Sequence, residues 1–192
     1  MKYFKFLLFA LTFLFACQPS NKTESNELPS DSIFNLSSEW QNQDNETLQL
    51  KALQGKTLVV VMIYTSCKTA CPVLVAKMKS IEQKISRKDI DKVSLVLVSI
   101  DPETDTPARL KEFANTNKMD GKQWIFLRSD EGNTQEFANV LSMKYKKISP
   151  LDFSHSNIIS VFNPKGELVS QEQGTEINVE AVVSTVNKTV NL

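Results

Sequence analysis

The sequence is poor in glycine, cysteine and histidine. It holds five glycines, three cysteines and a single histidine among 192 residues. Neither a dinucleotide-binding fingerprint nor a Walker-type loop is present, so a nucleotide-binding enzyme of either class is excluded. The 22 basic and 22 acidic residues cancel, which leaves no overall positive field to attract nucleic acid.

The length and composition are those of one folded domain. With 41% hydrophobic and 23% charged residues, the chain can bury a core, and disorder and collagen-like structure are excluded. The sequence has no internal repeat and no break between domains. The functional interpretation therefore depends on the three cysteines and the one histidine.

Residues 1–16 have the pattern of a signal peptide. Lys2 and Lys5 precede an apolar stretch from Phe6 to Ala16. This stretch has the length of a signal-peptide core and is too short for a membrane-spanning helix. Loss of the leader leaves 20 basic and 22 acidic residues, a net charge of −2.

The leader ends in Leu14-Phe15-Ala16-Cys17, which resembles the bacterial lipobox, whose cysteine is diacylated and becomes the first mature residue. We expect a lipidated Cys17, a flexible tether over residues 17–31 and the folded domain over residues 32–192. An ordinary secretory signal followed by a chance cysteine is the alternative. In either case the other two cysteines lie outside the cytoplasm, where disulfides persist.

Strand and helix patterns alternate along the mature chain. Continuous apolar runs predict buried strands at 58–64 and 93–100, and shorter strands follow at 124–127, 158–162 and 167–170. Helices are expected from Pro72, from Pro107 with Thr106 as its N-cap, around 137–141 and over 177–186. Alternating residues at 32–36 and 47–50 predict an N-terminal β-hairpin.

This order predicts an α/β fold with a central mixed β-sheet flanked by helices on both faces. A thioredoxin-like arrangement accommodates it, with a β-α-β first half and a β-β-α second half. The N-terminal hairpin is an addition to that arrangement.

Cys67 and Cys71 lie between the first buried strand and the helix after it. The carboxyl end of the sheet is where open α/β folds bind ligands. The helix N-terminus and Lys68 are expected to favour thiolate, which is both a metal ligand and a nucleophile. At this spacing the sulfurs can bond to each other or bracket one soft metal ion, and a merely structural disulfide is a further alternative.

His155 lies in a loop before the strand at 158–162, on the side that faces the cysteines in a thioredoxin-like fold. Two thiolates and one imidazole suit copper, because sulfur binds the cuprous ion and nitrogen makes the cupric ion tolerable. Zinc accepts the same ligands. An ordinary loop histidine is the alternative.

Three motifs together resemble the Sco/SenC family over residues 33–186. They are Tyr64-Thr65-Ser66-Cys67 with Cys71-Pro72, Val98-Ser99-Ile100-Asp101-Pro102 with Asp105-Thr106-Pro107, and His155-Ser156 before a strand and an Asn-Pro-Lys-Gly turn. Members are membrane-anchored, thioredoxin-like chaperones that deliver copper to the binuclear copper centre of cytochrome c oxidase. Some members have thiol–disulfide roles.

The resemblance implies that Cys67, Cys71 and His155 bind copper, as Cu(I) or Cu(II), and that the two cysteines form a reversible disulfide. It implies a chaperone whose partners are the copper-bearing subunit of cytochrome c oxidase and other copper chaperones or thiol reductants. The lipid-type anchor at Cys17 departs from the transmembrane helix of many members. Lys68 stands where many members have proline. Neither difference removes a ligand.

Two aspartates in the second motif have two interpretations. Asp101 and Asp105 either order the loop beside the site or form a solvated turn followed by a helix start. The sequence alone favours neither.

The main alternative function is a thiol–disulfide oxidoreductase that reduces the oxidase subunit or other exported proteins. Such enzymes favour two residues between the cysteines over the three found here. A peroxidase is disfavoured because its proline-led motif is absent, and a lipoprotein with a purely structural disulfide is a third interpretation. The expected location is a bacterial membrane, facing the periplasm or the cell exterior.

Overall fold

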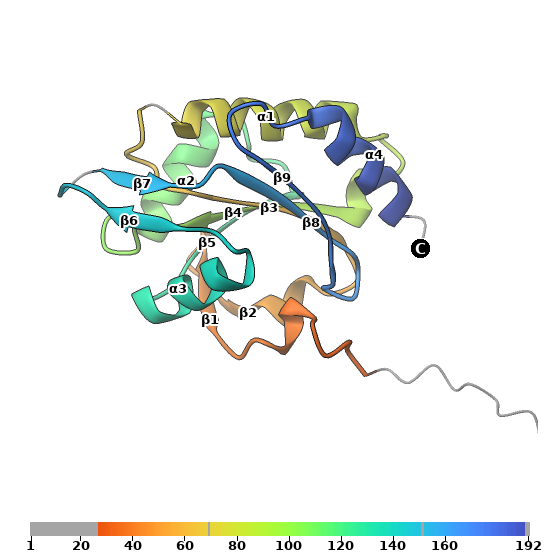
Figure 1. The fold of residues 1–192 in the computed structure, drawn as a ribbon, viewed down its shortest axis with the longest axis horizontal. Coiled ribbons are helices and arrows are strands. Elements are labelled where there is room, and N and C mark those ends of the chain that lie inside the picture. Colours follow the sequence, from red (N-terminus) through yellow and green to blue (C-terminus); the bar gives the residue numbers. More distant parts are fainter. Residues whose placement is uncertain (1–26, 69, 151, 191–192) are drawn as a thin grey trace, which may run out of the picture.

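The computed structural model describes residues 27–68, 70–150 and 152–190. A seven-stranded sheet with the order β2-β1-β5-β4-β3-β8-β9 forms its centre (Figure 1). Its strands are β1 (Glu39–Asn42), β2 (Thr47–Gln49), β3 (Thr57–Ile63), β4 (Val93–Ser99), β5 (Trp124–Arg128), β8 (Ile158–Phe162) and β9 (Leu168–Gln173). A separate ribbon pairs β6 (Tyr145–Lys147) with β7 (Phe153–His155).

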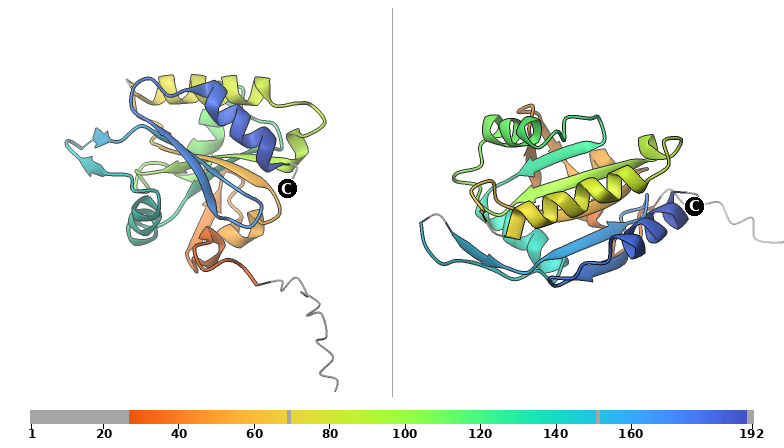
Figure 2. Two further views of the ribbon diagram at one scale, coloured as in Figure 1. Left: turned by 45° about the vertical axis from the view of Figure 1, so that its right-hand side comes forward. Right: turned by 90° about the horizontal axis from the view of Figure 1, so that it is seen from above.

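The helices are α1 (Ala70–Lys84), α2 (Pro107–Thr116), α3 (Glu131–Val140) and α4 (Val179–Thr189), with short 3₁₀ turns η1 (Ile33–Asn35), η2 (Leu50–Leu53) and η3 (Ile90–Lys92). Helices α1, α2 and α4 cover one face of the sheet, and α3 lies on the other with η1 and η2 (Figures 1 and 2). The predicted mixed sheet with helices on both faces is confirmed.

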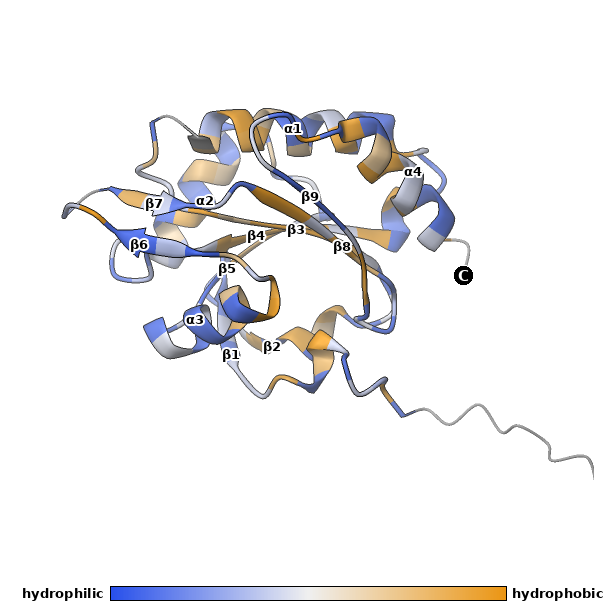
Figure 3. Cartoon of the chain, in the orientation of Figure 1, coloured by the Kyte–Doolittle hydropathy of each residue, from blue (hydrophilic) through white to orange (hydrophobic). Residues whose placement is uncertain are grey.

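The core is built on two parallel central strands. All seven residues of β3 and all seven of β4 are buried, as expected for strands covered on both faces. Apolar residues concentrate in these strands and in β8 (Figure 3). The units β3-α1-β4 and β8-β9-α4 are the two halves of the predicted thioredoxin-like order.

The N-terminal hairpin is present, but its first strand lies later than predicted. Residues 33–35 form η1, and the strand that pairs with β2 is β1, at Glu39–Asn42. The Ser32 hydroxyl accepts a hydrogen bond from the Phe34 amide and caps η1. The apolar residues Ile33 and Phe34 are therefore buried by a helical turn instead of a strand.

The predicted signal peptide and Cys17 lie outside the described residues, as does the tether up to residue 26. The tether's last residues contact the domain, because Leu28 packs against the core and the Pro29 carbonyl accepts the Ser32 amide at 3.0 Å. The Ile33 amide then donates to the Gly166 carbonyl at 2.9 Å. The chain therefore enters the domain beside the β8–β9 turn, at the end of β8 that is remote from β7.

A buried carboxylate holds the loop after β3. Asp105 is 0% exposed, and its carboxylate accepts hydrogen bonds from the Thr65 amide at 3.1 Å, the Thr65 hydroxyl at 2.5 Å and the Ser99 hydroxyl at 2.6 Å. Arg109 donates to the Thr65 hydroxyl at 2.7 Å and to the Ser66 hydroxyl at 3.0 Å. Burial raises the pKa of Asp105, and the hydrogen bonds oppose that rise.

Of the two interpretations of this motif, the structure supports the ordered loop. Asp101 is 2% exposed, and its carbonyl accepts the amides of Thr104 and Asp105. Thr106 is the N-cap of α2, with its hydroxyl accepting the Arg109 amide. The segment is thus a helix start, as predicted, and both aspartates of the turn before it are buried, although Glu103 between them is exposed.

We expect Asp105→Ala to lower the free energy of unfolding by about 2–4 kcal/mol, because it leaves buried donors of Thr65 and Ser99 without their acceptor. Urea unfolding followed by circular dichroism measures the change. The matched control is Asp44→Ala, which removes an exposed carboxylate paired with Lys111 and should cost less than about 1 kcal/mol. Equal losses in the two variants would contradict the role assigned to Asp105.

Candidate metal centre

Cys67, Cys71 and His155 meet at one end of the sheet. One ligand atom from each lies within 4.8 Å of the other two. The cysteines are buried and in the reduced form, and His155 is half-buried. The predicted proximity of the imidazole to the thiols is therefore confirmed.

The loop between β3 and α1 folds the two cysteines onto each other. The Cys67 amide donates to the Tyr64 carbonyl at 3.2 Å, which makes a turn directly after β3. The Cys71 amide donates to the Cys67 sulfur at 3.3 Å. The Cys67 sulfur therefore accepts one of the amides that the first turn of α1 leaves without a helical partner.

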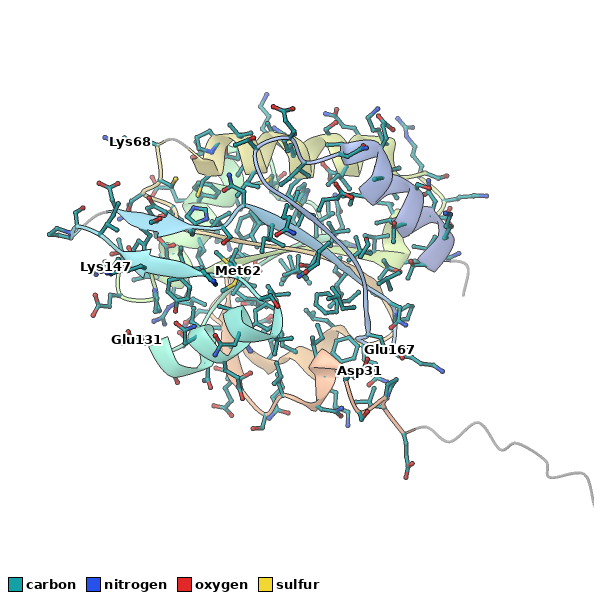
Figure 4. All side chains as sticks on the ribbon, in the orientation of Figure 1. Asp31, Met62, Lys68, Glu131, Lys147 and Glu167 are labelled. Atoms are coloured by element: carbon teal, nitrogen blue, oxygen red, sulfur yellow. The ribbon has the colours of Figure 1, made fainter. Side chains whose placement is uncertain are left out.

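The environment of Cys71 differs from the expectation. Burial raises the pKa of the Cys71 thiol well above its usual range, and neighbouring Cys67 raises it further. For Cys71 the prediction that Lys68 and the helix N-terminus favour thiolate is wrong, because Cys71 is 1% exposed while Lys68 points away from the loop (Figure 4). A metal ion that binds Cys71 must therefore displace its proton.

His155 is the last residue of β7 and not a loop residue. Its Nδ1 lies 3.2 Å from the Ser156 carbonyl oxygen. Its Nε2 is buried and has no hydrogen-bond partner within the described ranges. A ligating histidine commonly donates its other ring N–H to such a carbonyl, and a buried nitrogen without a partner is costly. The Nε2 atom is therefore the one suited to bind a metal.

Tyr64 connects the cysteine loop to β7, a role that was not predicted. Its ring lies 5.1 Å from the Phe153 ring and 5.9 Å, edge-on, from the His155 ring. Its hydroxyl accepts the Phe153 amide at 3.3 Å. Burial raises the pKa of Tyr64 to about 12, so the side chain is a neutral phenol at physiological pH. Its place at the end of a buried strand, next to the cysteine loop, is the signal that points to it.

The donor set restricts which metals fit. Two sulfurs and one imidazole nitrogen suit copper and zinc, whereas calcium and magnesium prefer oxygen ligands. Copper binds such sites more strongly than zinc does. The residues present therefore fit a copper ion.

Sequence comparison gives a match along almost the whole described chain. Residues 28–191 match the family SCO1/SenC. The SCO1 protein homolog of Bacillus subtilis (strain 168) is 29% identical over 182 residues, which cover 92% of this chain and 91% of that relative.

Three solved structures have a similar fold. A SCO1/SenC family lipoprotein from Bacillus anthracis superposes with a TM-score of 0.73 at 22% identity, covering 82% of this chain and 95% of that one. Copper-bound ScoI from Arabidopsis thaliana gives 0.68 at 22%, covering 80% and 94%. BsSco, a member of the Sco family of cytochrome c oxidase assembly proteins with a disulfide switch, gives 0.70 at 27%, covering 80% and 91%.

Within the described part of the chain, no helix is long and apolar enough to cross a membrane. The sequence match begins at Leu28, where the first core contact of the domain is also found. It continues through both cysteines, His155 and α4. By this match the chain belongs to the SCO1/SenC family.

Proposed function

We propose that this protein binds one copper ion through Cys67, Cys71 and His155 and delivers it to the copper-bearing subunit of cytochrome c oxidase. The observation that carries the proposal is the buried His155 Nε2, which has no hydrogen-bond partner in the described chain and belongs to the ligand set gathered within 4.8 Å. The copper in Arabidopsis ScoI and the oxidase-assembly role of BsSco support it.

The position of the site suits transfer better than permanent storage. His155 is one of the residues that line a hollow of about 260 Å³, so another protein can approach this end of the domain beside one of the three ligands. Three protein ligands leave a copper ion able to accept a further one. Ligands of the receiving protein would then replace those of this chain one at a time.

A thiol–disulfide role is the second candidate, and one observation favours it. The two sulfurs lie within 4.8 Å, so a small movement would bring them to bonding distance. The raised pKa of the Cys71 thiol argues against it as an attacking group, because thiolate is the nucleophile. In such a role Cys67, the more exposed of the two cysteines, would be the attacking thiol.

Membrane attachment through Cys17 is part of the same proposal. The apolar leader and the lipobox-like Leu14-Phe15-Ala16-Cys17 support cleavage after residue 16 and lipidation. The Bacillus anthracis neighbour, itself a lipoprotein, supports export. The domain would then work outside the cytoplasm, held by a tether at the membrane.

We expect the reduced protein to bind copper at a 1:1 ratio, and Cys67→Ser, Cys71→Ser and His155→Ala each to weaken binding by more than about 100-fold, since losing a ligand costs more than losing an outer-shell partner. Copper titration with absorbance and electron spin resonance measures this. The control is Ser154→Ala, an exposed neighbour of His155, which should bind like wild type.

The same variants separate the two candidate functions. Unchanged copper binding in His155→Ala would overturn the copper site. Reductase activity on the oxidase subunit that survives His155→Ala and is lost in Cys67→Ser would favour the oxidoreductase instead.

We expect the protein to incorporate a radiolabelled fatty acid in its host, and Cys17→Ser to abolish the label and release the protein from the membrane fraction. Cys67→Ser is the matched control and should stay labelled. A labelled Cys17→Ser protein, or an unlabelled wild type, would contradict the lipid anchor.

A further inference from the structure

The β6–β7 ribbon has two chemically different faces. Tyr145 pairs with His155 across the ribbon, and the rings of Phe153 and His155 pack against Tyr64. Because side chains alternate along a strand, Lys146 and its partner Ser154 lie on the opposite face. We call this opposite face, together with the flanking Lys144 and Ser156, the outer ribbon face.

The outer ribbon face is basic. Lys144 and Lys146 are both exposed, and neither forms an ion pair within the described residues. By contrast, Lys147 alternates to the inner face and pairs with Glu103 at 3.0 Å. The acidic residue nearest in the ribbon sequence, Asp152, lies in the turn, where its carboxylate accepts the Ser149 hydroxyl. Hydrophilic colour covers β6 in Figure 3.

A hollow on this face is lined in part by His155, whose side chain belongs to the candidate metal site. It has a volume of about 260 Å³ and is lined by Lys144, Tyr145, Lys146, Ser154, His155 and Ser156. Two lysines that form no ion pair within the described residues therefore line the same hollow as His155. On the cysteine side, the exposed Lys68 projects from the loop at the same end of the molecule (Figure 4).

This basic end lies away from the point where the chain enters the domain. The Ile33 amide bonds to Gly166 beyond the end of β8, whereas His155 precedes the start of β8. The five residues of β8 span roughly 16 Å. The first described residues and the ribbon lie on opposite sides of the domain (Figures 1 and 2).

We infer that the outer ribbon face docks an acidic surface of the protein that receives the copper, with Lys144 and Lys146 guiding the partner to His155. The inference rests on the proposed function. An acidic partner protein fits better than an anionic membrane. Lys68, Lys144 and Lys146 are three cations, fewer than the four to eight that are typical of lipid-binding clusters. The surface is also hollow and remote from the chain entry. Charge complementarity of this kind mainly accelerates association.

The test measures copper transfer from the full mature protein to the purified copper-bearing oxidase subunit of the same organism by stopped flow. Near 20 mM salt, the double variant Lys144→Glu/Lys146→Glu should transfer about 10-fold more slowly than wild type. The difference should largely vanish near 0.5 M salt, where screening shortens the reach of charge. Lys144→Gln/Lys146→Gln should show a smaller loss in the same direction.

The matched control is Lys51→Glu/Lys122→Glu, which makes the same change of charge at exposed positions outside the hollow and should stay within about twofold of wild type. Equal slowing in both double variants would overturn the docking surface. Loss of copper binding in the Lys144→Glu/Lys146→Glu variant would also overturn it. Unchanged transfer in that variant, together with lysine-dependent binding of the protein to phosphatidylglycerol vesicles, would overturn it in favour of a membrane. Absence of any transfer from wild type would overturn the proposed delivery itself.

Discussion

The hydrogen-bonded burial of one carboxylate, Asp105, sets the geometry on which the rest of the site depends. Asp105 accepts hydrogen bonds from Thr65, two residues after β3, and from Ser99, the last residue of β4, and the next residue, Thr106, is the N-cap of α2. A buried charge is costly unless hydrogen bonds compensate it. Here the compensating donors belong to the last residue of β4 and to the loop that directly follows β3. Since Thr65 is two residues from Cys67, these hydrogen bonds to the core also restrict the position of the Cys67 thiol.

The three candidate ligands come from two parts of the fold, and the cysteine loop is held by more contacts than the β6–β7 ribbon. The cysteines lie between a seven-residue buried strand and a helix, with the Asp105 bonds beside them. His155 lies on a three-residue strand whose ladder partner is β6, and Tyr64 joins that strand to the body by one hydrogen bond and two ring contacts. The thiols thus form the fixed part of the ligand set, and the imidazole is added from the ribbon.

Long apolar runs and chemical motifs were predictable from the sequence, and short or environment-dependent features were not. Strands β3 and β4 carry enough consecutive buried residues to be unambiguous, and the cysteine pair follows from its place after β3. Strands β6 and β7 have three residues each, too few to show a period. The alternating segment after Ser32 forms η1 instead of a strand, because the Ser32 hydroxyl accepts a hydrogen bond from the Phe34 amide. The pKa of Cys71 depends on burial by residues distant in sequence, which no local pattern reveals.

The chain has one histidine, and it lies within this site. Any imidazole resonance in a proton spectrum of the untagged protein therefore reports on position 155 alone. The same holds for histidine-specific chemical modification and for nitrogen coupling from an imidazole in a copper spectrum. The molecule carries its own single-site label, and that label is lost as soon as a polyhistidine tag is used for purification.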